Sequence, residues 1–278
     1  MNALRKDAFK SPFYHVAIIV LLALGLVSLP IDMLFNLFIL DAHKAKLLGG
    51  ITLRIVLSVF AVIAIKKYGF IKPFTSHDGI KAFLMVMPAL VIAINNFPFS
   101  AIINDKVIFD CDAISVVLYV LYCISVGFFE ELIYCGLVFP LCLYVCRHKK
   151  YSAVFAVAVS SAIFALSHII NLFSGMSVGA TLLQIGYSFL IGAMCSISKC
   201  VTRNIFTAIT LHAIYDIGGL LLGGIGIASG NQWDTFTIVF TAIIGVITAI
   251  YMIILAFKVG HDEVGELYFT EEQSECGD

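Results

Sequence analysis

The chain has 278 residues, of which 61% are hydrophobic and only 13% charged, with a formal net charge of −1 at pH 7. Soluble domains contain roughly 45–50% apolar and about 25% charged residues, so this composition excludes a water-soluble globule and also an intrinsically disordered chain. The sequence has no basic run of the kind that binds nucleic acid. It predicts an all-α, polytopic transmembrane helical bundle whose surroundings are membrane lipid.

Eight apolar stretches are long enough to span a bilayer core of about 30 Å, which takes about 20 residues. The first is too long for a signal peptide and is expected to be a true span. With the N-terminus in the cytoplasm, the outer loops hold only Lys44, Lys46 and Lys106, and the inner loops, including Lys199, hold most other Lys and Arg. This distribution favours a multi-pass protein with both termini in the cytoplasm. The predicted spans are 14–40, 47–65, 82–103, 112–146, 152–171, 177–199, 204–229 and 234–257.

Five ionisable residues stand out within these stretches, because each unpaired charge in a bilayer costs several kcal/mol and is therefore retained for a function or a specific partner. Glu130 and Glu131 lie deep in the fourth stretch, His168 near the end of the fifth, and His212 and Asp216 one helical turn apart in the seventh. Adjacent carboxylates repel each other, which suits one of them to general acid or base chemistry. The alternative is that two helices are joined at the glutamates by a water-exposed loop. It is disfavoured because no turn residues flank the glutamates.

The depth of these residues allows them to meet. At a rise of about 1.5 Å per residue, all of them fall within the bilayer, so three helices are able to present Glu, His, His and Asp to one internal cavity. Asp216 is placed either to bind a metal or to orient the His212 imidazole. A set of Glu, two His and Asp also satisfies a zinc-like site.

Three motifs in this part of the chain resemble a known family. They are Glu-Glu-x-x-Tyr-x-Gly at 130–136, Phe164-x-x-x-His168 and His212-x-x-x-Asp216. Their order and spacing are similar to those of the CPBP intramembrane proteases, which include the prenyl-protein (CAAX) endopeptidases and bacterial bacteriocin-processing or self-immunity proteins. Arg203-Asn204 also fits the family.

The resemblance covers about 112–220 and divides the chain into three regions. Residues 1–111 form an N-terminal three-span region, 112–229 the CPBP protease core, and 230–278 the last span with an acidic cytoplasmic tail. The resemblance implies a hydrolase, specifically an intramembrane endopeptidase. Its substrate would be a membrane-associated peptide or lipidated protein, such as a prenylated C-terminus, a leader peptide or a transmembrane segment.

By the same resemblance, Glu130 activates the attacking water, with Glu131, His168 and His212 around the reaction centre. The fourth group, Asp216, is Asn or Asp in the family. An ionised Asp cannot donate a hydrogen bond to an oxyanion, which favours a role for Asp216 in orienting a histidine or binding a metal. If a divalent metal such as zinc is used, the ligands expected from the sequence are Glu130, His168, His212 and Asp216.

One position departs from the family. The family's first motif is EExxxR, and Cys135 stands where the Arg belongs. We therefore expect that Glu131 is protonated, that a cation is supplied from elsewhere, or that activity is weakened. Arg54 lies within a predicted span and is one such cation, although a side chain that extends to the membrane interface is the favoured interpretation of it.

Two other functions remain open at the sequence level. A non-catalytic CPBP-fold scaffold or bacteriocin self-immunity protein is the main alternative to a protease, supported by the missing Arg at Cys135. A secondary transporter with a Glu/His proton relay would predict an internal repeat between the two halves of the chain, and the sequence has none.

Overall fold

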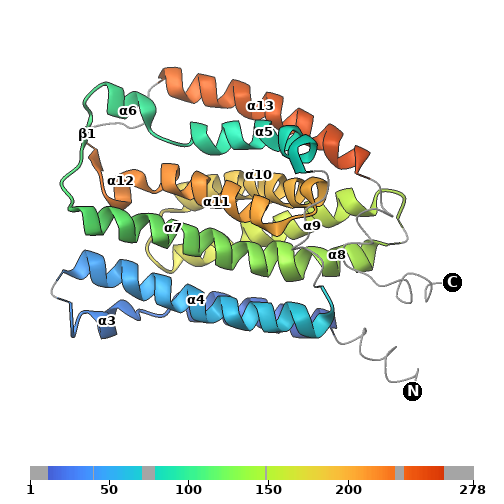
Figure 1. Ribbon diagram of the computed structural model, residues 1–278, viewed down its shortest axis with the longest axis horizontal. Helices are drawn as coiled ribbons and strands as arrows, with labels where there is room; N and C mark the ends of the chain where they lie inside the picture. Colours follow the sequence, from blue (N-terminus) through green and yellow to red (C-terminus); the bar gives the residue numbers. More distant parts are fainter. Residues whose placement is uncertain (1–11, 40, 71–78, 148, 229–234, 260–278) are drawn as a thin grey trace.

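The computed structural model describes residues 12–39, 41–70, 79–147, 149–228 and 235–259. These residues form a bundle of helices that run roughly side by side (Figure 1). Helices α5 (Gly79–Asn95) and α13 (Thr235–Lys258) lie along one side, and α4 (Ala42–Tyr68) lies along the opposite side. Helices α7 (Ala113–Ile133) and α11 (Ile205–Gly219) lie between them and pack against each other.

The remaining elements complete the bundle. A short antiparallel ribbon pairs Val107 with Ala228 and Ile108 with Ile227 at one end of it. The elements not yet named are α2 (Pro12–Val27), α3 (Asp32–Phe35), α6 (Phe99–Ile103), β1 (Val107–Ile108), the π-helical turn η2 (Tyr134–Val138), α8 (Phe139–Cys146), α9 (Ser152–Ser167), the 3-10 segment η3 (His168–Leu172), α10 (Val178–Thr202), α12 (Leu221–Gly224) and β2 (Ile227–Ala228).

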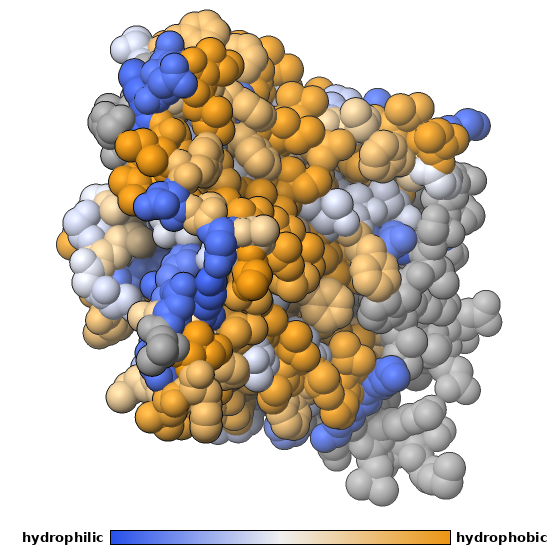
Figure 2. All heavy atoms as spheres, turned by 60° about the vertical axis from the view of Figure 1, so that its left-hand side comes forward, coloured by the Kyte–Doolittle hydropathy of each residue, from blue (hydrophilic) through white to orange (hydrophobic). Residues whose placement is uncertain are grey.

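The polytopic helical bundle predicted from composition is confirmed. Among the described residues, six helical runs are long and apolar enough to cross a membrane, and α5 and α11 are shorter apolar helices. Together these elements follow the eight predicted stretches in chain order. The outer surface is suited to lipid, because large hydrophobic side chains are exposed along it and cover most of the face shown in Figure 2. On α13 the exposed set includes Phe236, Phe240, Ile243, Ile247, Ile250 and Ile254.

The two shorter helices end earlier than the sequence predicts, for a common reason. Helix α5 ends at Asn95 and α11 at Gly219, where the ends of both helices meet. The Asn96 side chain donates a hydrogen bond to the Tyr215 carbonyl over 2.8 Å. A Cβ atom at Gly218 would lie 2.7 Å from the Phe97 amide nitrogen, so this position requires glycine.

The fourth predicted stretch forms one continuous helical run from Ala113 to Cys146. Its first part, α7, ends immediately after the two glutamates, and η2 follows without a break. The Phe139 N–H donates to the Tyr134 carbonyl, five residues back, and α8 then starts at Phe139 with Pro140 in its first turn. The structure therefore contradicts a water-exposed loop between two separate helices at the glutamates. A widened, π-helical turn begins instead at Tyr134, directly after Ile133.

Charged residues gather where α4 and α7 begin. The Asp41 side chain accepts hydrogen bonds from the backbone N–H groups of His43 and Lys44, and Asp112 caps α7 by accepting from Ser115 N–H over 2.8 Å. The Lys44 ammonium bonds Asp112 over 2.5 Å and holds the pKa of that carboxyl down at about 2. This contact joins the starts of the two helices at the bundle end opposite the one where α4, α8 and α13 end (Figure 1).

Candidate functional site

Two helices bring four of the predicted residues together. Glu130 and Glu131 lie in the last turn of α7, and His212 and Asp216 lie one turn apart on α11. The helices approach closely because Gly127 has no side chain. A Cβ atom there would lie 3.0 Å from the backbone nitrogen of Ala213, the residue after His212.

The His212 ring is the centre of the group. Its Nδ1 lies 2.7 Å from Glu131 Oε1, which is a hydrogen bond, and its Nε2 lies 3.5 Å from Glu130 Oε2 and 3.7 Å from Asp216 Oδ2. Three carboxyl groups therefore surround one imidazole. An imidazolium donates from both ring nitrogens, so this arrangement favours a proton on each of them.

The carboxyl groups differ in how accessible they are. The Glu130 side chain is 23% exposed, whereas those of Glu131 and His212 are 4% and 5% exposed. Glu131 Oε2 and Asp216 Oδ2 are buried and accept no hydrogen bond within the described part of the chain. Glu130 is therefore the carboxylate that a water molecule reaches most readily, and Glu131 and His212 form the buried base of the site.

His168 is adjacent to this group but is not bonded to it. It begins η3 directly after α9, and its Nδ1 lies 3.1 Å from the Phe164 carbonyl oxygen. The Phe164 ring meets the His168 ring edge-on at 5.0 Å and the His212 ring edge-on at 5.7 Å. Within the described residues, no hydrogen bond or ion pair joins His168 to the carboxyl groups, and Phe164 positions the two histidines relative to each other.

Arg54 does not replace the missing family arginine. Its guanidinium donates to the Gly50 carbonyl over 3.2 Å and to the Tyr122 hydroxyl over 3.3 Å, and it stacks over the Tyr122 ring. Within the described residues it forms no ion pair with Glu131. The Arg54 side chain instead joins α4 to α7.

Lys199 corrects the loop assignment made from charge. Rather than lying in a cytoplasmic loop, it is part of α10 and only 1% exposed. Its Nζ donates to the Cys135 carbonyl over 2.8 Å and lies 3.9 Å from the centre of the Phe139 ring. No local sequence pattern predicts this burial, since a lysine near the end of an apolar stretch usually reaches water.

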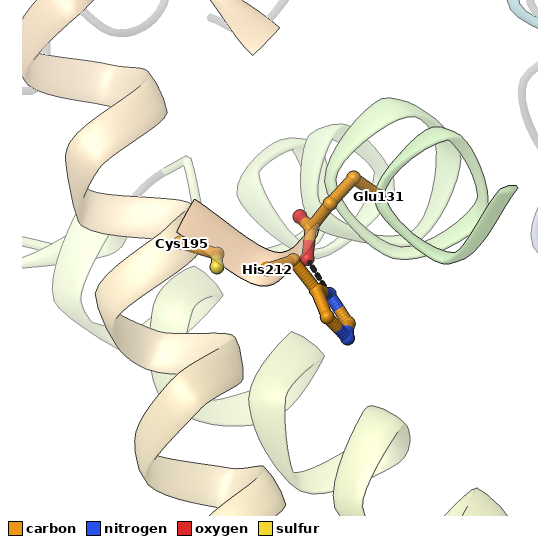
Figure 3. Close-up of side chains that lie close together, drawn as sticks. All are labelled: Glu131, Cys195 and His212. Carbon is orange, nitrogen blue, oxygen red and sulfur yellow. Dashed lines mark hydrogen bonds and ion pairs between the residues drawn. The ribbon is translucent and has the colours of Figure 1, made fainter. Parts of the chain in front are cut away.

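One group of side chains offers ligand atoms for a metal. Ligand atoms of Glu131, Cys195 and His212 lie within 4.8 Å of one another, and all three residues are buried (Figure 3). One oxygen, one sulfur and one nitrogen suit zinc, and the unpartnered Glu131 Oε2 is an additional donor. This set shares only His212 with the metal ligands predicted from the sequence, and Cys195 was not singled out there.

Comparison with known proteins identifies the middle of the chain. Residues 112–218 match the family model of the type II CAAX prenyl endopeptidase Rce1-like proteins. A search of the curated proteins and a search of the solved structures found no match. The matched region begins at the cap of α7 and ends within α11, so it contains all five residues singled out by sequence and the cores of both helices that build the His212 site. Residues 112–218 of this multi-pass membrane protein are therefore similar to the Rce1-like family, the type II CAAX prenyl endopeptidases.

Proposed function

We propose that this protein is an intramembrane endopeptidase that hydrolyses a peptide bond of a membrane-associated substrate, with a water molecule activated by Glu130. The observation that carries the proposal is the placement of His212 among three carboxyl groups, of which Glu130 is the most accessible at 23%, ahead of Asp216 at 15% and Glu131 at 4%. This placement provides a general base next to a group able to stabilise negative charge. The Rce1-like match supports hydrolysis of a prenylated peptide.

In the proposed reaction, Glu130 carries the proton from the attacking water to the leaving group. Glu130 takes a proton from water, and the resulting hydroxide attacks the scissile carbonyl carbon. The tetrahedral oxyanion is stabilised by His212 Nε2–H, and His168, whose ring packs on the same Phe164 ring, is a second donor to the substrate. Glu130 then returns its proton to the leaving amine nitrogen, which breaks the peptide bond.

The other two carboxyl groups prepare His212 for this step. Glu131 accepts from Nδ1–H, which fixes the ring so that Nε2 points toward Glu130 and Asp216. Asp216 stabilises positive charge on the ring, in keeping with a role in orienting the histidine. A divalent metal such as zinc would be held by Glu131, Cys195 and His212, where it would add positive charge but compete with the hydrogen bond between Glu131 and His212.

We also propose that both termini lie in the cytoplasm. Helices α4, α8 and α13 end at the same end of the bundle (Figure 1). Basic residues stand at each of these ends, namely Lys66 and Lys67, Arg147, and Lys258. Because positive charge is retained on the cytoplasmic side, this end of the bundle is the cytoplasmic one.

The test is turnover of a prenylated peptide by the purified protein in lipid nanodiscs. We expect cleavage by the wild type and a loss of at least about 100-fold in Glu130→Gln, the usual contribution of a general base. Asp105→Asn is the matched control, since Asp105 is exposed and has a positive φ of 54°, which Asn tolerates well. The same peptide without its prenyl group tests the substrate class.

Two results would contradict the proposal. Equal cleavage by the wild type and Glu130→Gln would remove Glu130 from the reaction. Saturable binding of the peptide without any turnover would favour the non-catalytic scaffold or self-immunity protein, the function that the missing family arginine at Cys135 supports.

A further inference from the structure

Lys199 is a buried cation that the proposed reaction does not use. It lies in the last turn of α10 and is only 1% exposed, in a helix that is long and apolar enough to cross a membrane. A lysine in such a position is stabilised only where the protein supplies acceptors or an aromatic face. The Cys135 carbonyl and the Phe139 ring supply both.

The Cys135 carbonyl needs a donor because of the local backbone. In an α-helical turn it would accept from the N–H of Phe139, and in a π turn from that of residue 140. The Phe139 N–H donates instead to the Tyr134 carbonyl, and residue 140 is a proline, which has no N–H. The Lys199 ammonium fills this gap over 2.8 Å and so closes the widened turn η2.

This contact lies one turn beyond the buried carboxyl group of the site. Cys135 is four residues after Glu131 and therefore lies on the same face of the helical run. Cys135 is 2% exposed, and its Sγ contacts Ser196 Oγ at 3.4 Å. Ser196 and Lys199 are three residues apart on α10, so this face of α10 covers the position where the family has its arginine.

We infer that Lys199 takes the place of the missing family arginine: it supplies from α10 the positive charge that the EExxxR motif would place at position 135. Lys199 is a positioning residue, because it acts on η2 and through it on the contact between Glu131 and His212. This role rests on the proposed function, since it concerns the geometry of the same site. Of the three outcomes that the sequence left open for Cys135, this inference selects the second, in which a cation is supplied from another helix.

Exchange of the cation between the two helices tests this inference. The variants are Lys199→Met, Cys135→Arg and the double variant with both changes. Lys199→Met removes the charge, and we expect kcat to fall by about tenfold or more, as for other groups that orient a catalytic residue, with KM nearly unchanged. Cys135→Arg alone brings two cations together in a buried position and should lower kcat similarly. The double variant has one cation again and should recover kcat to within about threefold of the wild type.

The matched control is Lys46→Met, the same substitution at an exposed lysine of α4, which should leave kcat unchanged. A double variant no more active than Lys199→Met would overturn the inference, and so would wild-type kcat in Lys199→Met. A purely structural role for Lys199 would lower the amount of folded protein and leave kcat per folded molecule unchanged.

Thermal unfolding separates this inference from the proposed function. If the wild type cleaves no peptide, the proposed function fails, but the same four proteins still form a stability cycle. A double variant with a higher unfolding temperature than either single variant supports the exchange of the cation. A double variant as unstable as Lys199→Met, or one that does not fold, rejects it.

Discussion

Glu131 Oε1 lies 2.7 Å from His212 Nδ1, and this hydrogen bond joins the end of α7 to the middle of α11 inside the bundle. Both side chains are almost completely buried. Because one ring nitrogen is held in this way, the other faces Glu130 and Asp216 at 3.5 and 3.7 Å. The first prediction follows from this contact.

Glu131→Gln should lower kcat by roughly 10- to 100-fold, the range found when a group that orients a histidine is lost. A protonated Glu131, one of the outcomes left open by the absence of an arginine one turn away, would make this substitution mild. The contact with His212 changes this expectation, because the amide keeps a hydrogen bond to Nδ1 and loses the negative charge. Steady-state cleavage by Glu131→Gln and Glu130→Gln, measured side by side, should show the larger loss in Glu130→Gln. Wild-type kcat in Glu131→Gln would mean that His212 is oriented without it.

Gly127→Ala should separate α7 from α11. A methyl group there would lie 3.0 Å from the Ala213 nitrogen and 3.1 Å from the Ile209 oxygen, both of them backbone atoms that cannot move aside alone. Overpacking of this kind costs about 1–3 kcal/mol of unfolding free energy, and the shift should also lengthen the contact between Glu131 and His212. Thermal unfolding in detergent and peptide cleavage measure the two effects.

Gly186→Ala is the control for this substitution, because a Cβ atom at Gly186 in α10 would have nothing within 4 Å. Alanine is the better helix former by up to about 1 kcal/mol, so this variant should be as stable as the wild type or more stable. Equal behaviour of the two alanine variants would show that close approach of α7 and α11 is not needed.

The sequence was sufficient for the helices and for the residues around His212. Long apolar stretches define the spans, and buried ionisable residues are few, so Glu130, Glu131, His212 and Asp216 stood out by their type. Their helical spacing placed His212 and Asp216 on one face, and the structure brings both within reach of the glutamates. The shortening of α5 and α11 was not predictable, because it depends on tertiary contact between Asn96 and Gly218.

Lys199 and Cys195 were missed for a physical reason. A lysine at the end of a predicted span is normally counted with the adjacent loop, and a cysteine in an apolar stretch is normally a small buried residue. The burial of Lys199 depends on a carbonyl left free at Cys135 by Pro140 and the π-helical turn. No pattern within α10 carries this information, since the cause lies in a different helix.

Asp112→Ala should destabilise the protein near neutral pH, because it removes both the cap of α7 and the ion pair with Lys44. The hydrogen bond from Lys44 lowers the pKa of Asp112 from 3.8 to about 2. A carboxyl group with a lowered folded-state pKa contributes stability above its unfolded pKa and loses it as the pH falls through its folded pKa. The difference in unfolding temperature between the wild type and Asp112→Ala should therefore be largest above about pH 4 and should shrink toward pH 2.

Asp112→Asn isolates the ion pair in this experiment, since Asn still accepts from Ser115 N–H as a cap. It should be more stable than Asp112→Ala near neutral pH and should show the same loss of pH dependence. Asp110→Asn, in the same connection, should behave as the wild type. A stability difference between the wild type and Asp112→Asn that stays constant from pH 5 to pH 2 would show that the contact with Lys44 contributes nothing.

Zinc should bind at Glu131, Cys195 and His212 and inhibit the reaction. Two ligand atoms on one tetrahedral zinc ion lie roughly 3.3 Å apart, so the 2.7 Å contact between Glu131 and His212 must open before the ion enters. The ion also needs the Nδ1 lone pair and the Cys195 thiolate, and it would turn the His212 ring away from Glu130. We expect added zinc to lower kcat of the wild type and chelators to leave cleavage unchanged.

Cys195→Ala tests whether the inhibition is caused by zinc bound at this group. The substitution removes one of the three ligands and leaves the contact between Glu131 and His212 in place. Its affinity for zinc, measured by calorimetry, should fall by about tenfold or more, and its cleavage should become correspondingly less sensitive to the ion. Cys200→Ala is the matched control, a buried cysteine of the same helix outside the ligand group.

Loss of cleavage in the presence of a chelator, with recovery when zinc is added, would contradict this prediction and make the metal part of the catalytic site. In that case Glu131 would act as a ligand of the catalytic metal, beside Glu130 as the general base. Cys195→Ala would then abolish both zinc binding and activity.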